Sequence, residues 1–320
     1  MSDRPVPEDR AAAITSASIP GDTDGPMAGS KVARRPKVGV VLGSGGIKAF
    51  AALALFQFLD ENNIDVDFIA GCSGGALTAA VRGAGFSLAE TRALLTEFVS
   101  GKLFSNLDYR TFLGMARLPF GRFENGSGIL RSEGIREIYQ GIFKDLRIED
   151  LRPRTVIQAT DVLTGDGVVL SEGLVADAVY ASSAGFPLLP PICIGDRWLV
   201  DGAFSSSLPV LEAVNQGMDV IIAVAFRQHL SGQAPASFFE HVVSFMGRTT
   251  NINEAREMSL AIDLHHHEIV LIDVHFDRII QMWDADAIPI VLEVGQQALE
   301  TKKHAILSAI ASFAPFAPRQ

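Results

Sequence analysis

A serine flanked by glycines stands directly after an apolar run, a setting in which its hydroxyl can act as a nucleophile. Ser73 is the centre of GCSGG, which fits the pattern Gly-x-Ser-x-Gly. This pattern needs a sharp turn from a strand into a helix, with small neighbours, so that the hydroxyl projects from the sheet edge. Residues 66–70 predict the strand and residues 76–82 the start of the helix, so we interpret Ser73 as a nucleophile. Serine and glycine are also common helix N-caps, which is the alternative. The motif consists of Gly71, Cys72, Ser73, Gly74 and Gly75.

A glycine-rich loop precedes this motif by about one strand-and-helix unit. In VVLGSGGIKAF, residues 40–50, a strand ends and a helix begins, and the first N–H groups of a helix have no partner within it. Such a loop can bind the pyrophosphate of a dinucleotide or the oxyanion of an acyl-transfer reaction. The dinucleotide pattern Gly-x-Gly-x-x-Gly has Lys48 at its third glycine, which weakens that alternative, and a turn without a ligand is a third. The candidate oxyanion loop consists of Gly43, Ser44, Gly45, Gly46, Ile47 and Lys48.

No histidine precedes residue 229, so a proton acceptor for Ser73 must be sought elsewhere. The seven histidines stand outside glycine-rich turns. The run at 265–267 lacks a matching Cys, Asp or Glu spacing, so we expect no metal. In WLVDGAF, residues 198–204, Asp201 follows a predicted strand. A carboxylate there is expected on the same sheet edge as the two loops, and partial burial can raise its pKa enough for a general base. The alternative is an Asp-Gly turn. The motif consists of Asp201, Gly202 and Ala203.

Alternating strand and helix patterns predict one α/β domain over residues 37–320. Apolar runs that end in glycines indicate buried parallel strands, and the segments between them indicate helices that cover the sheet. Residues 86–145 predict a helical cap region, and a long helix over 288–313 predicts a C-terminal helical closure at about 285–314. Residues 1–36, with five prolines among small and polar residues, predict a disordered tail. Further predicted strands are residues 38–42, 155–160, 168–170, 198–200, 220–226 and 269–274, and further predicted helices are residues 47–59 and 174–183.

The composition is that of an acidic globular protein. The chain has 27 basic and 37 acidic residues, a net charge of −10, which argues against nucleic acid as a main partner because phosphate binding needs a basic face. No apolar run reaches the length of a membrane span, and we expect no signal peptide. Cys72 and Cys193 stand in apolar segments and are interpreted as two buried thiols, with one disulfide between them as the alternative. We therefore expect a cytoplasmic protein, at most peripheral to the membrane.

The three motifs GSGGIK, GCSGG and DGA, in this order, resemble the patatin-like phospholipase family, especially its bacterial members. The resemblance extends over about residues 37–300 and includes the segments QATDVLTGDGVVLSEG, ASSAGFPLLPPICIGDRWLVDGAFSSSLPV and QGMDVIIAVAF. It implies a three-layer α/β/α sandwich with a mainly parallel central sheet. It also implies hydrolysis of acyl esters in phospholipids, lysophospholipids or related lipids, without a cofactor.

The resemblance further implies a Ser–Asp dyad without a histidine. Carried over by position, Ser73 is the nucleophile, Asp201 is the base, and the glycines at 43, 45 and 46 form the oxyanion loop. Lys48 matches the basic position after those glycines. Ser44 stands where a further glycine is frequent, and Ala49 stands where a glycine often follows the basic residue; both are small residues.

Residues 109–123, YRTFLGMARLPFGRF, mix three arginines with bulky apolar residues. This mixture suits an interfacial cap over an acyl groove, with transient contact to a membrane surface. A buried helix with solvated arginines is the alternative. Two other functions stay open: a catalytically weak lipid-binding or regulatory module, and a nucleotide-binding α/β oxidoreductase. The sequence leaves the oligomeric state, the head group and the acyl length open.

Overall fold

The structure is a computed structural model that describes residues 34–100, 108–115, 119–122, 124–228, 238–266, 268–278, 280 and 284–313. The chain divides into two compact units, residues 1–34 and 35–320, and every element described below belongs to the second unit. The tail predicted for residues 1–36 lies outside the described residues except for its last three positions.

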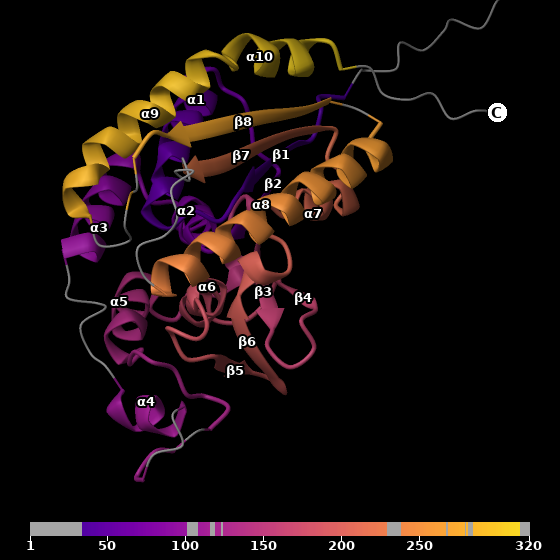
Figure 1. The fold of residues 1–320 in the computed structure, drawn as a ribbon. Coiled ribbons are helices and arrows are strands. Elements are labelled where there is room, and N and C mark those ends of the chain that lie inside the picture. The colour runs from indigo at the N-terminus through magenta and orange to yellow at the C-terminus, as the bar shows by residue number, and fades with distance from the viewer. Residues whose placement is uncertain are drawn as a thin grey trace, which may run out of the picture. The chain divides into compact units, whose positions relative to one another are not determined.

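An eight-stranded sheet forms the centre of the second unit (Figure 1). Its strands are β1 (Val38–Leu42), β2 (Phe68–Cys72), β3 (Arg154–Asp161), β4 (Gly167–Leu170), β5 (Ile192–Ile194), β6 (Arg197–Asp201), β7 (Val220–Gln228) and β8 (Glu268–Phe276). Five neighbouring strands, in the order β3-β2-β1-β7-β8, run parallel. The antiparallel strands β6 and β4 both pair with β3, and β5 pairs with β6. The prediction of a mainly parallel sheet is confirmed.

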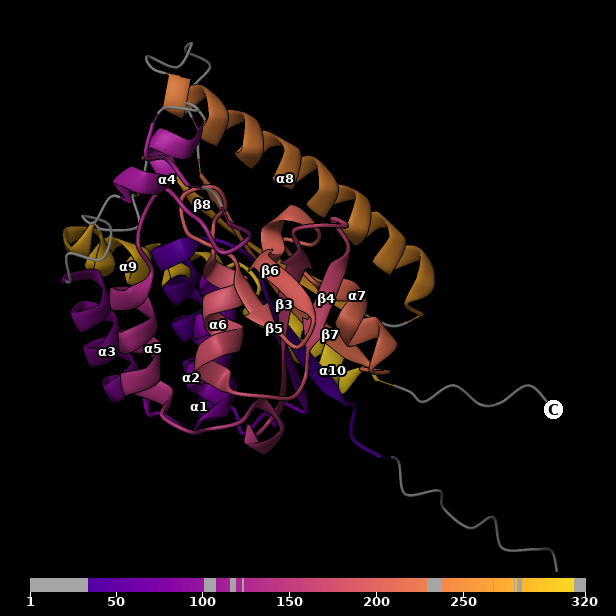
Figure 2. The same cartoon turned by 90° about the horizontal axis from the view of Figure 1, so that it is seen from below.

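Helices cover both faces of the sheet, so the fold is a three-layer α/β/α arrangement (Figures 1 and 2). The helices are α1 (Leu53–Glu61), α2 (Gly74–Gly83), α3 (Leu88–Ser100), α4 (Tyr109–Met115), α5 (Glu133–Phe143), α6 (Val175–Ser183), α7 (Val210–Asn215), α8 (Phe238–Leu264), α9 (Ile288–Glu300) and α10 (Lys303–Ala311), with 3₁₀ segments η1 (Gly46–Ala52), η2 (Ile148–Asp150), η3 (Gly202–Phe204) and η4 (Ala285–Ala287). Apolar residues of α7 and α8 pack on one face, and those of α1, α2, α5, α6, α9 and α10 pack on the other.

The central strands are buried on both faces, which explains their continuous apolar sequences. All five residues of β1 are buried. Val40 and Leu42 belong to the core on one side of the sheet, and Val41 belongs to the core on the other. Successive side chains of a strand point to opposite faces, so helices on both faces require apolar residues at every position.

Two predicted helices are each divided in the structure. The helix predicted for 47–59 begins as η1 and becomes α-helical only at Leu53. The helix predicted for 288–313 is wrong as a single element, because it is interrupted between α9 and α10. At the interruption Thr301 Oγ1 donates to Ala298 O (2.7 Å) and Lys302 N–H donates to Leu299 O (2.8 Å). A threonine hydroxyl that bonds the preceding turn competes with regular helical bonding.

No element was predicted between residues 229 and 268, and most of this segment is the 27-residue helix α8. The short strand β5 was also missed. Cys193 on β5 is exposed, so the interpretation of two buried thiols is wrong for this residue; both cysteines are free thiols. β5 is a short edge strand, and an exposed position on such a strand accepts a small apolar residue. From the sequence alone, an apolar residue at this position was taken for a core residue.

Candidate active site

Ser73 occupies the turn between β2 and α2 in a backbone conformation that non-glycine residues rarely adopt. Its φ is 53° and its ψ is −120°, a conformation that costs on the order of 1–3 kcal/mol. Ser73 is the N-cap residue of α2, yet its side chain makes no capping hydrogen bond. Instead, Ser73 Oγ donates a hydrogen bond of 2.8 Å to Asp201 Oδ2. The turn therefore directs the hydroxyl to a carboxylate, and the interpretation of Ser73 as only a cap loses its basis.

The glycines beside Ser73 let two backbone segments approach more closely than side chains permit. A Cβ on Gly74 would collide with the backbone of Gly46, and one on Gly75 would collide with Leu42 O and Gly43 O. The first turn of α2 therefore lies directly against the loop that follows β1. The two glycine motifs of the sequence are in contact with each other, and this packing requires that neither residue of α2 carries a side chain.

Ser182 and Gln158, which were not singled out from the sequence, fix the backbone of the turn at Ser73 through hydrogen bonds. Ser73 N–H donates to Ser182 Oγ (2.8 Å), and Ser182 Oγ donates to Gln158 O (2.6 Å). Ser182 has no exposed surface. Gln158 is the register partner of Cys72 in the β2–β3 ladder, so the two hydrogen bonds connect α6, β3 and the turn. A serine at the end of a helix gives no signal in the sequence that separates this role from an ordinary polar position.

Asp201 is the last residue of β6, and both of its carboxylate oxygens accept hydrogen bonds. Oδ2 accepts from Ser73 Oγ, and Oδ1 accepts from Ala203 N–H (2.9 Å). Asp201 N–H donates to Ala184 O (3.0 Å), which fixes the strand end. A Cβ on Gly202 would collide with Gln158 O, so the glycine after Asp201 is needed for the close passage of this turn along β3.

Burial raises the pKa of Asp201 from 3.8 to about 6, and the hydrogen bonds from Ala203 and Ser73 oppose this rise. The charged form loses hydration in the protein, whereas the two donors stabilise it. A pKa near 6 leaves the carboxylate ionised at neutral pH and more basic than an exposed aspartate. The group can therefore accept a proton from the hydroxyl that it already binds.

The glycine loop after β1 is held by its first two amides. Gly43 N–H donates to Val224 O (3.0 Å), and Ser44 N–H donates to Ser207 O (2.7 Å). Within the described parts of the chain, the N–H groups of Gly45 and Gly46 have no hydrogen-bond partner. The Gly46 N–H borders Gly74, the residue after Ser73. Both amides belong to the predicted oxyanion loop.

The remaining two residues of this loop face other parts of the molecule. Ile47 is buried in the core, with 3% of its surface exposed. Lys48 N–H donates to Gly45 O (3.2 Å), and Lys48 Nζ donates to Gln228 Oε1 (3.1 Å) at the end of β7. Burial lowers the pKa of Lys48 to about 8, since a desolvated ammonium loses its hydration.

Three consecutive serines fasten the loop that follows Asp201. Ser205 Oγ shares a hydrogen bond of 2.8 Å with Thr160 Oγ1 on β3. Ser206 Oγ donates to Glu257 Oε2 (2.5 Å) and Ser207 Oγ donates to Glu254 Oε2 (3.3 Å), both on α8. Ser207 O accepts the Ser44 N–H, so the loop after Asp201 also helps to fix the position of the glycine loop after β1. The sequence FSSSLPV did not reveal which hydroxyl contacts which element.

Two of the described histidines contact groups outside the Ser73–Asp201 pair. His275 Nε2 lies 3.0 Å from Asp273 Oδ2, and His265 Nε2 lies 3.3 Å from Asp219 O. His229 and His267 lie outside the described residues. No group of His, Cys, Asp and Glu residues in the described ranges has the arrangement of a metal site.

Cys72 lies beside the dyad and is fully buried, with its Sγ 4.0 Å from Asp201 Oδ1. Burial, together with the negative charges of Asp201, Glu257 and Glu254, raises the pKa of this thiol well above its usual value. The thiolate is the nucleophilic form of cysteine. Cys72 therefore stays a neutral thiol that fills the space beside the turn, and its interpretation as a buried thiol is confirmed.

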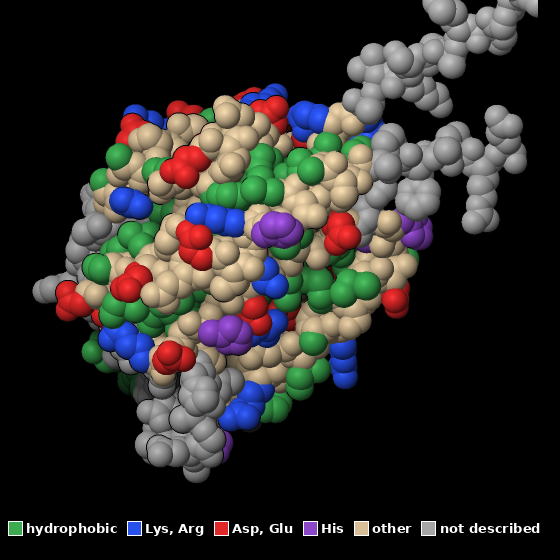
Figure 3. Space-filling model, turned by 90° about the horizontal axis from the view of Figure 1, so that it is seen from above, with side chains coloured by type: hydrophobic (Ala, Val, Ile, Leu, Met, Phe, Trp, Pro, Cys, Tyr) green, Lys and Arg blue, Asp and Glu red, His purple; other side chains and the backbone are tan. Residues whose placement is uncertain are grey.

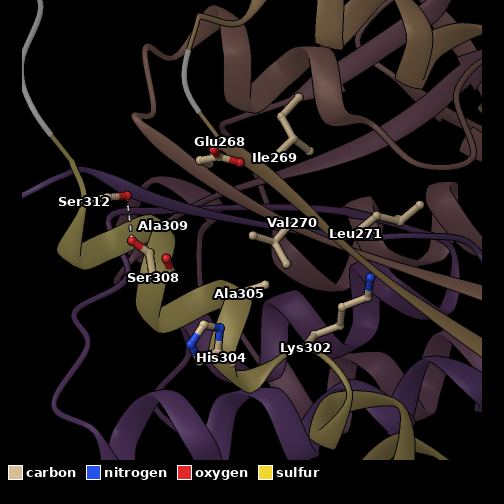
Figure 4. A pocket seen from close by; sticks show the side chains of 10 residues that line it. All are labelled: Glu268, Ile269, Val270, Leu271, Lys302, His304, Ala305, Ser308, Ala309 and Ser312. Carbon is tan, nitrogen blue, oxygen red and sulfur yellow. Dashed lines mark hydrogen bonds between the residues drawn. The ribbon is translucent and has the colours of Figure 1, made fainter.

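A pocket of about 320 Å³ lies far from these residues, between the edge strand β8 and α10 (Figure 4). Its walls include Glu268 and Leu271 of β8 and His304 and Ser308 of α10. Neither Ser73 nor Asp201 contributes to it. We do not assign this pocket to the chemistry of Ser73. In the described part of the chain, no helix has the length and apolar character needed to cross a bilayer.

A family model described as patatin-like phospholipase matches residues 40–214 of the chain. An uncharacterized NTE family protein of Mycobacterium tuberculosis is 31% identical over 199 residues, which is 62% of this chain and 51% of that protein. A lysophospholipase of Kluyveromyces lactis, NTE1, is 28% identical over 189 residues, which is 58% of this chain and 12% of that protein. The chain thus corresponds to only a part of each relative.

Two solved structures have similar arrangements at low sequence identity. VipD from Legionella pneumophila is 14% identical, with a TM-score of 0.46 over 84% of this chain and 67% of its own. Human GIVD cytosolic phospholipase A2 is 11% identical, with a TM-score of 0.45 over 87% of this chain and 62% of its own.

Proposed function

The chain belongs to the patatin-like phospholipase family, and from this premise we propose that it is a serine acyl hydrolase. Its substrates are fatty-acyl esters of phospholipids, lysophospholipids or related lipids. The observation that carries the proposal is the hydrogen bond of 2.8 Å from Ser73 Oγ to Asp201 Oδ2. A strained turn, a buried carboxylate and an adjacent pair of unpartnered amides are the parts that acyl transfer requires.

In the proposed first step, Ser73 Oγ attacks the ester carbonyl carbon while its proton passes to Asp201. The pKa of Asp201, raised to about 6 by burial, favours this transfer relative to an exposed aspartate. The tetrahedral intermediate then expels the alcohol, which takes the proton, and an acyl-enzyme remains. In the second step a water molecule gives its proton to Asp201 and attacks the acyl carbonyl. The bond between the acyl carbon and Ser73 Oγ then breaks, Ser73 Oγ takes the proton back from Asp201, and the fatty acid leaves.

The negative charge of each intermediate requires hydrogen-bond donors that are already in place. The Gly45 and Gly46 amides are suited to this role because the Gly43 and Ser44 amides are bonded to Val224 O and Ser207 O. Ser73 also stands at the N-terminus of α2, where the helix dipole favours negative charge. The position of Gly74 against Gly46 supports the closeness of these donors to Ser73.

The lipid class is proposed from the family and from one relative whose name states lysophospholipase activity. The acyl chain must approach from the open side of the dyad, and residues 109–123 are candidates for this approach. Tyr109 and Phe120 are 69% and 93% exposed. Residues 116–118 and 123, and the side chains at 112 and 115, lie outside the described residues.

An activity-based fluorophosphonate probe tests the proposal directly. We expect covalent labelling of the native protein at Ser73, located by peptide mass spectrometry, and no labelling of Ser73→Ala. The same variant must lose lysophospholipid hydrolysis by at least ~10³-fold while it keeps its thermal midpoint. Labelling at another residue, or unchanged hydrolysis by Ser73→Ala, excludes this function. A protein that binds lipid vesicles but takes up no probe fits the alternative of a catalytically weak lipid-binding module.

The nucleotide-binding alternative is less well supported. The glycine loop leads into the 3₁₀ segment η1 and not directly into an α-helix, whereas the dinucleotide motif places the pyrophosphate at an α-helix N-terminus. A dinucleotide that raises the thermal midpoint would favour this alternative.

A further inference from the structure

Helix α8 has two faces with different roles. Its inner face carries Glu254, with 8% of its surface exposed, and Ala261, which is fully buried. Glu254 Oε1 accepts from Arg227 Nη2 (2.6 Å), and Arg227 Nε donates to Asp273 Oδ1 (2.7 Å). Together with the serine contacts described above, these bonds attach α8 to β7, β8 and the loop after Asp201. The outer face is therefore held in a fixed orientation relative to the Ser73–Asp201 pair.

The outer face presents one line of side chains at spacings of four and three residues. His241, Phe245, Arg248, Ile252 and Arg256 are all exposed, and positions so spaced lie on one side of an α-helix. Phe245 is 71% exposed and Ile252 is 53% exposed. We refer to these five residues as the α8 stripe. Along this line two large exposed apolar side chains alternate with two arginines, and exposed apolar side chains that gather beside polar ones can mark an interaction site.

The arginines of the stripe have no acidic partner in the described structure. Neither Arg248 nor Arg256 lies within ion-pair distance of a carboxylate, as far as the described residues go. The chain as a whole carries a net charge of −10. On the face in Figure 3, by contrast, acidic and basic side chains are interspersed without a field of one sign. The stripe is thus a local basic and apolar surface on an acidic protein.

The stripe begins near the edge of the sheet at which the proposed dyad lies. The N-terminal end of α8 and helix α4 stand at the same end of the fold in both ribbon views (Figures 1 and 2). In Figure 1 the arrowheads of β7 and β8 point to the side where the N-terminal end of α8 lies. The segment 109–122, which begins with α4, has a similar composition, with exposed Tyr109 beside Arg110 and exposed Phe120 near Arg122. Arg122 is paired with Glu124 (2.5 Å), whereas Arg110 has no acidic partner in the described ranges.

We propose that the α8 stripe docks on an anionic lipid surface. This inference deepens the proposed function, on which it rests for the reason why a lipid surface is visited. Phe245 and Ile252 enter the boundary between head groups and acyl chains, while Arg248 and Arg256 attract anionic head groups. A second copy of the chain that docks through the same stripe is the less suitable occupant, because a two-fold symmetric contact would place the arginines of one stripe against those of the other.

Co-sedimentation with lipid vesicles tests the stripe without any need for hydrolysis. One set of vesicles consists of phosphatidylcholine with about 30 mol% phosphatidylglycerol, and the other of phosphatidylcholine alone. The charge variant Arg248→Gln with Arg256→Gln is expected to reduce binding to the anionic vesicles about ten-fold. The apolar variant Phe245→Ser with Ile252→Ser is expected to reduce binding to both sets. Raised salt is expected to weaken wild-type binding to the anionic vesicles only.

Matched controls carry the same changes at other exposed positions. Arg131→Gln with Arg154→Gln removes the same charge, and Ile290→Ser with Leu307→Ser removes apolar side chains that are 39% and 41% exposed on α9 and α10. Circular dichroism melting checks that every variant is folded. Wild-type binding by the stripe variants, or equal losses in the control variants, overturns the proposal. So does a wild-type dimer that the stripe variants dissociate while vesicle binding stays unchanged.

Failure of the proposed function gives a different result. If Ser73 takes up no fluorophosphonate and no lysophospholipid is hydrolysed, but the stripe variants lose vesicle binding, then the docking surface stands and the hydrolase proposal falls. If the probe labels Ser73 and the stripe variants bind like wild type, then the hydrolase proposal stands and the docking surface falls.

Discussion

Ser73 Oγ lies 2.8 Å from Asp201 Oδ2, although 128 positions of the sequence separate the two residues. The strand that carries Asp201 runs antiparallel to β3, and its register places Asp201 opposite Ala159. On the other side of β3, Gln158 is the partner of Cys72. The carboxylate is thus brought level with the turn at Ser73 through β3, which both strands share as a neighbour.

Asp201→Asn separates the proposed chemistry from stability. The amide keeps the size of the carboxylate but cannot take the proton of Ser73, so we expect ester hydrolysis to fall by at least ~10³-fold. The buried charge is removed, so the free energy of unfolding at pH 8 should not fall and can rise by up to about 3 kcal/mol. Urea titration and hydrolysis assays on the same preparation measure both quantities. A large loss of stability with intact hydrolysis would contradict the assigned role.

The stability difference between Asp201→Asn and wild type should depend on pH in a defined direction. The pKa of Asp201 in the folded protein is about 6, above the usual 3.8. The folded state therefore holds a proton between these values that the unfolded state has already lost. The contribution of Asp201 to stability is present below pH ~4 and is lost as the pH rises to about 6. The free energy of unfolding of Asp201→Asn, relative to that of wild type, should therefore increase between pH ~4 and about 6 and stay constant at higher pH.

The pH dependence of kcat/KM should report the ionisation of Asp201. Because the carboxylate form accepts the proton, activity should rise through about pH 6, the value to which burial raises the pKa of Asp201. Initial rates on a soluble short-chain ester between pH 4 and about 8 measure this profile. An acidic limb near pH ~4 would indicate an exposed carboxylate as the base, which contradicts the buried dyad.

Gly74→Ala should disrupt the contact between the two glycine motifs. Its Cβ would collide with the backbone of Gly46, so either α2 or the glycine loop must move. We expect a loss of about 1–3 kcal/mol in the free energy of unfolding. We also expect kcat to decrease by a larger factor than KM changes. The matched control is Gly141→Ala on α5, where no heavy atom lies within 4 Å of the added Cβ. There the same change should stabilise by about 0.4–1 kcal/mol. Equal changes in the free energy of unfolding and in kcat for the two variants would contradict a role of the Gly74–Gly46 contact in stability and activity.

Ser182→Ala should release the backbone of the turn while Ser73 and Asp201 stay intact. The change leaves Ser73 N–H and Gln158 O without the hydroxyl that now bonds to both. Each buried polar group that loses its hydrogen-bond partner lowers the free energy of unfolding by at most about 1–3 kcal/mol. We expect lower stability together with slower fluorophosphonate labelling. Ser183→Ala is the control, since its hydroxyl donates to Val179 O of its own helix. Unchanged labelling in Ser182→Ala would exclude a positioning role.

The sequence by itself determined the parallel core and the two motifs that supply Ser73 and Asp201. Strands buried on both faces must be apolar at every position, so β1, β2 and β7 could be predicted from their continuous apolar runs. The sequence singled out the glycines of GSGG and GCSGG for a loop and a sharp turn, and the contacts of Gly74 and Gly75 explain why no side chain fits at these two positions. These features depend on local chain geometry, which a few neighbouring residues specify.

Other features were decided only by tertiary structure. Helix α8 was missed because Phe245 and Ile252 are apolar yet exposed, so the periodicity that marks a buried face was blurred. The engagement of Gly43 and Ser44 by Val224 O and Ser207 O depends on partners more than 160 positions away. The sequence placed Asp201 at the correct edge by assuming a parallel strand, whereas β6 is antiparallel. Strand register and long-range hydrogen bonds result from the packing of the whole sheet, and no local pattern specifies them.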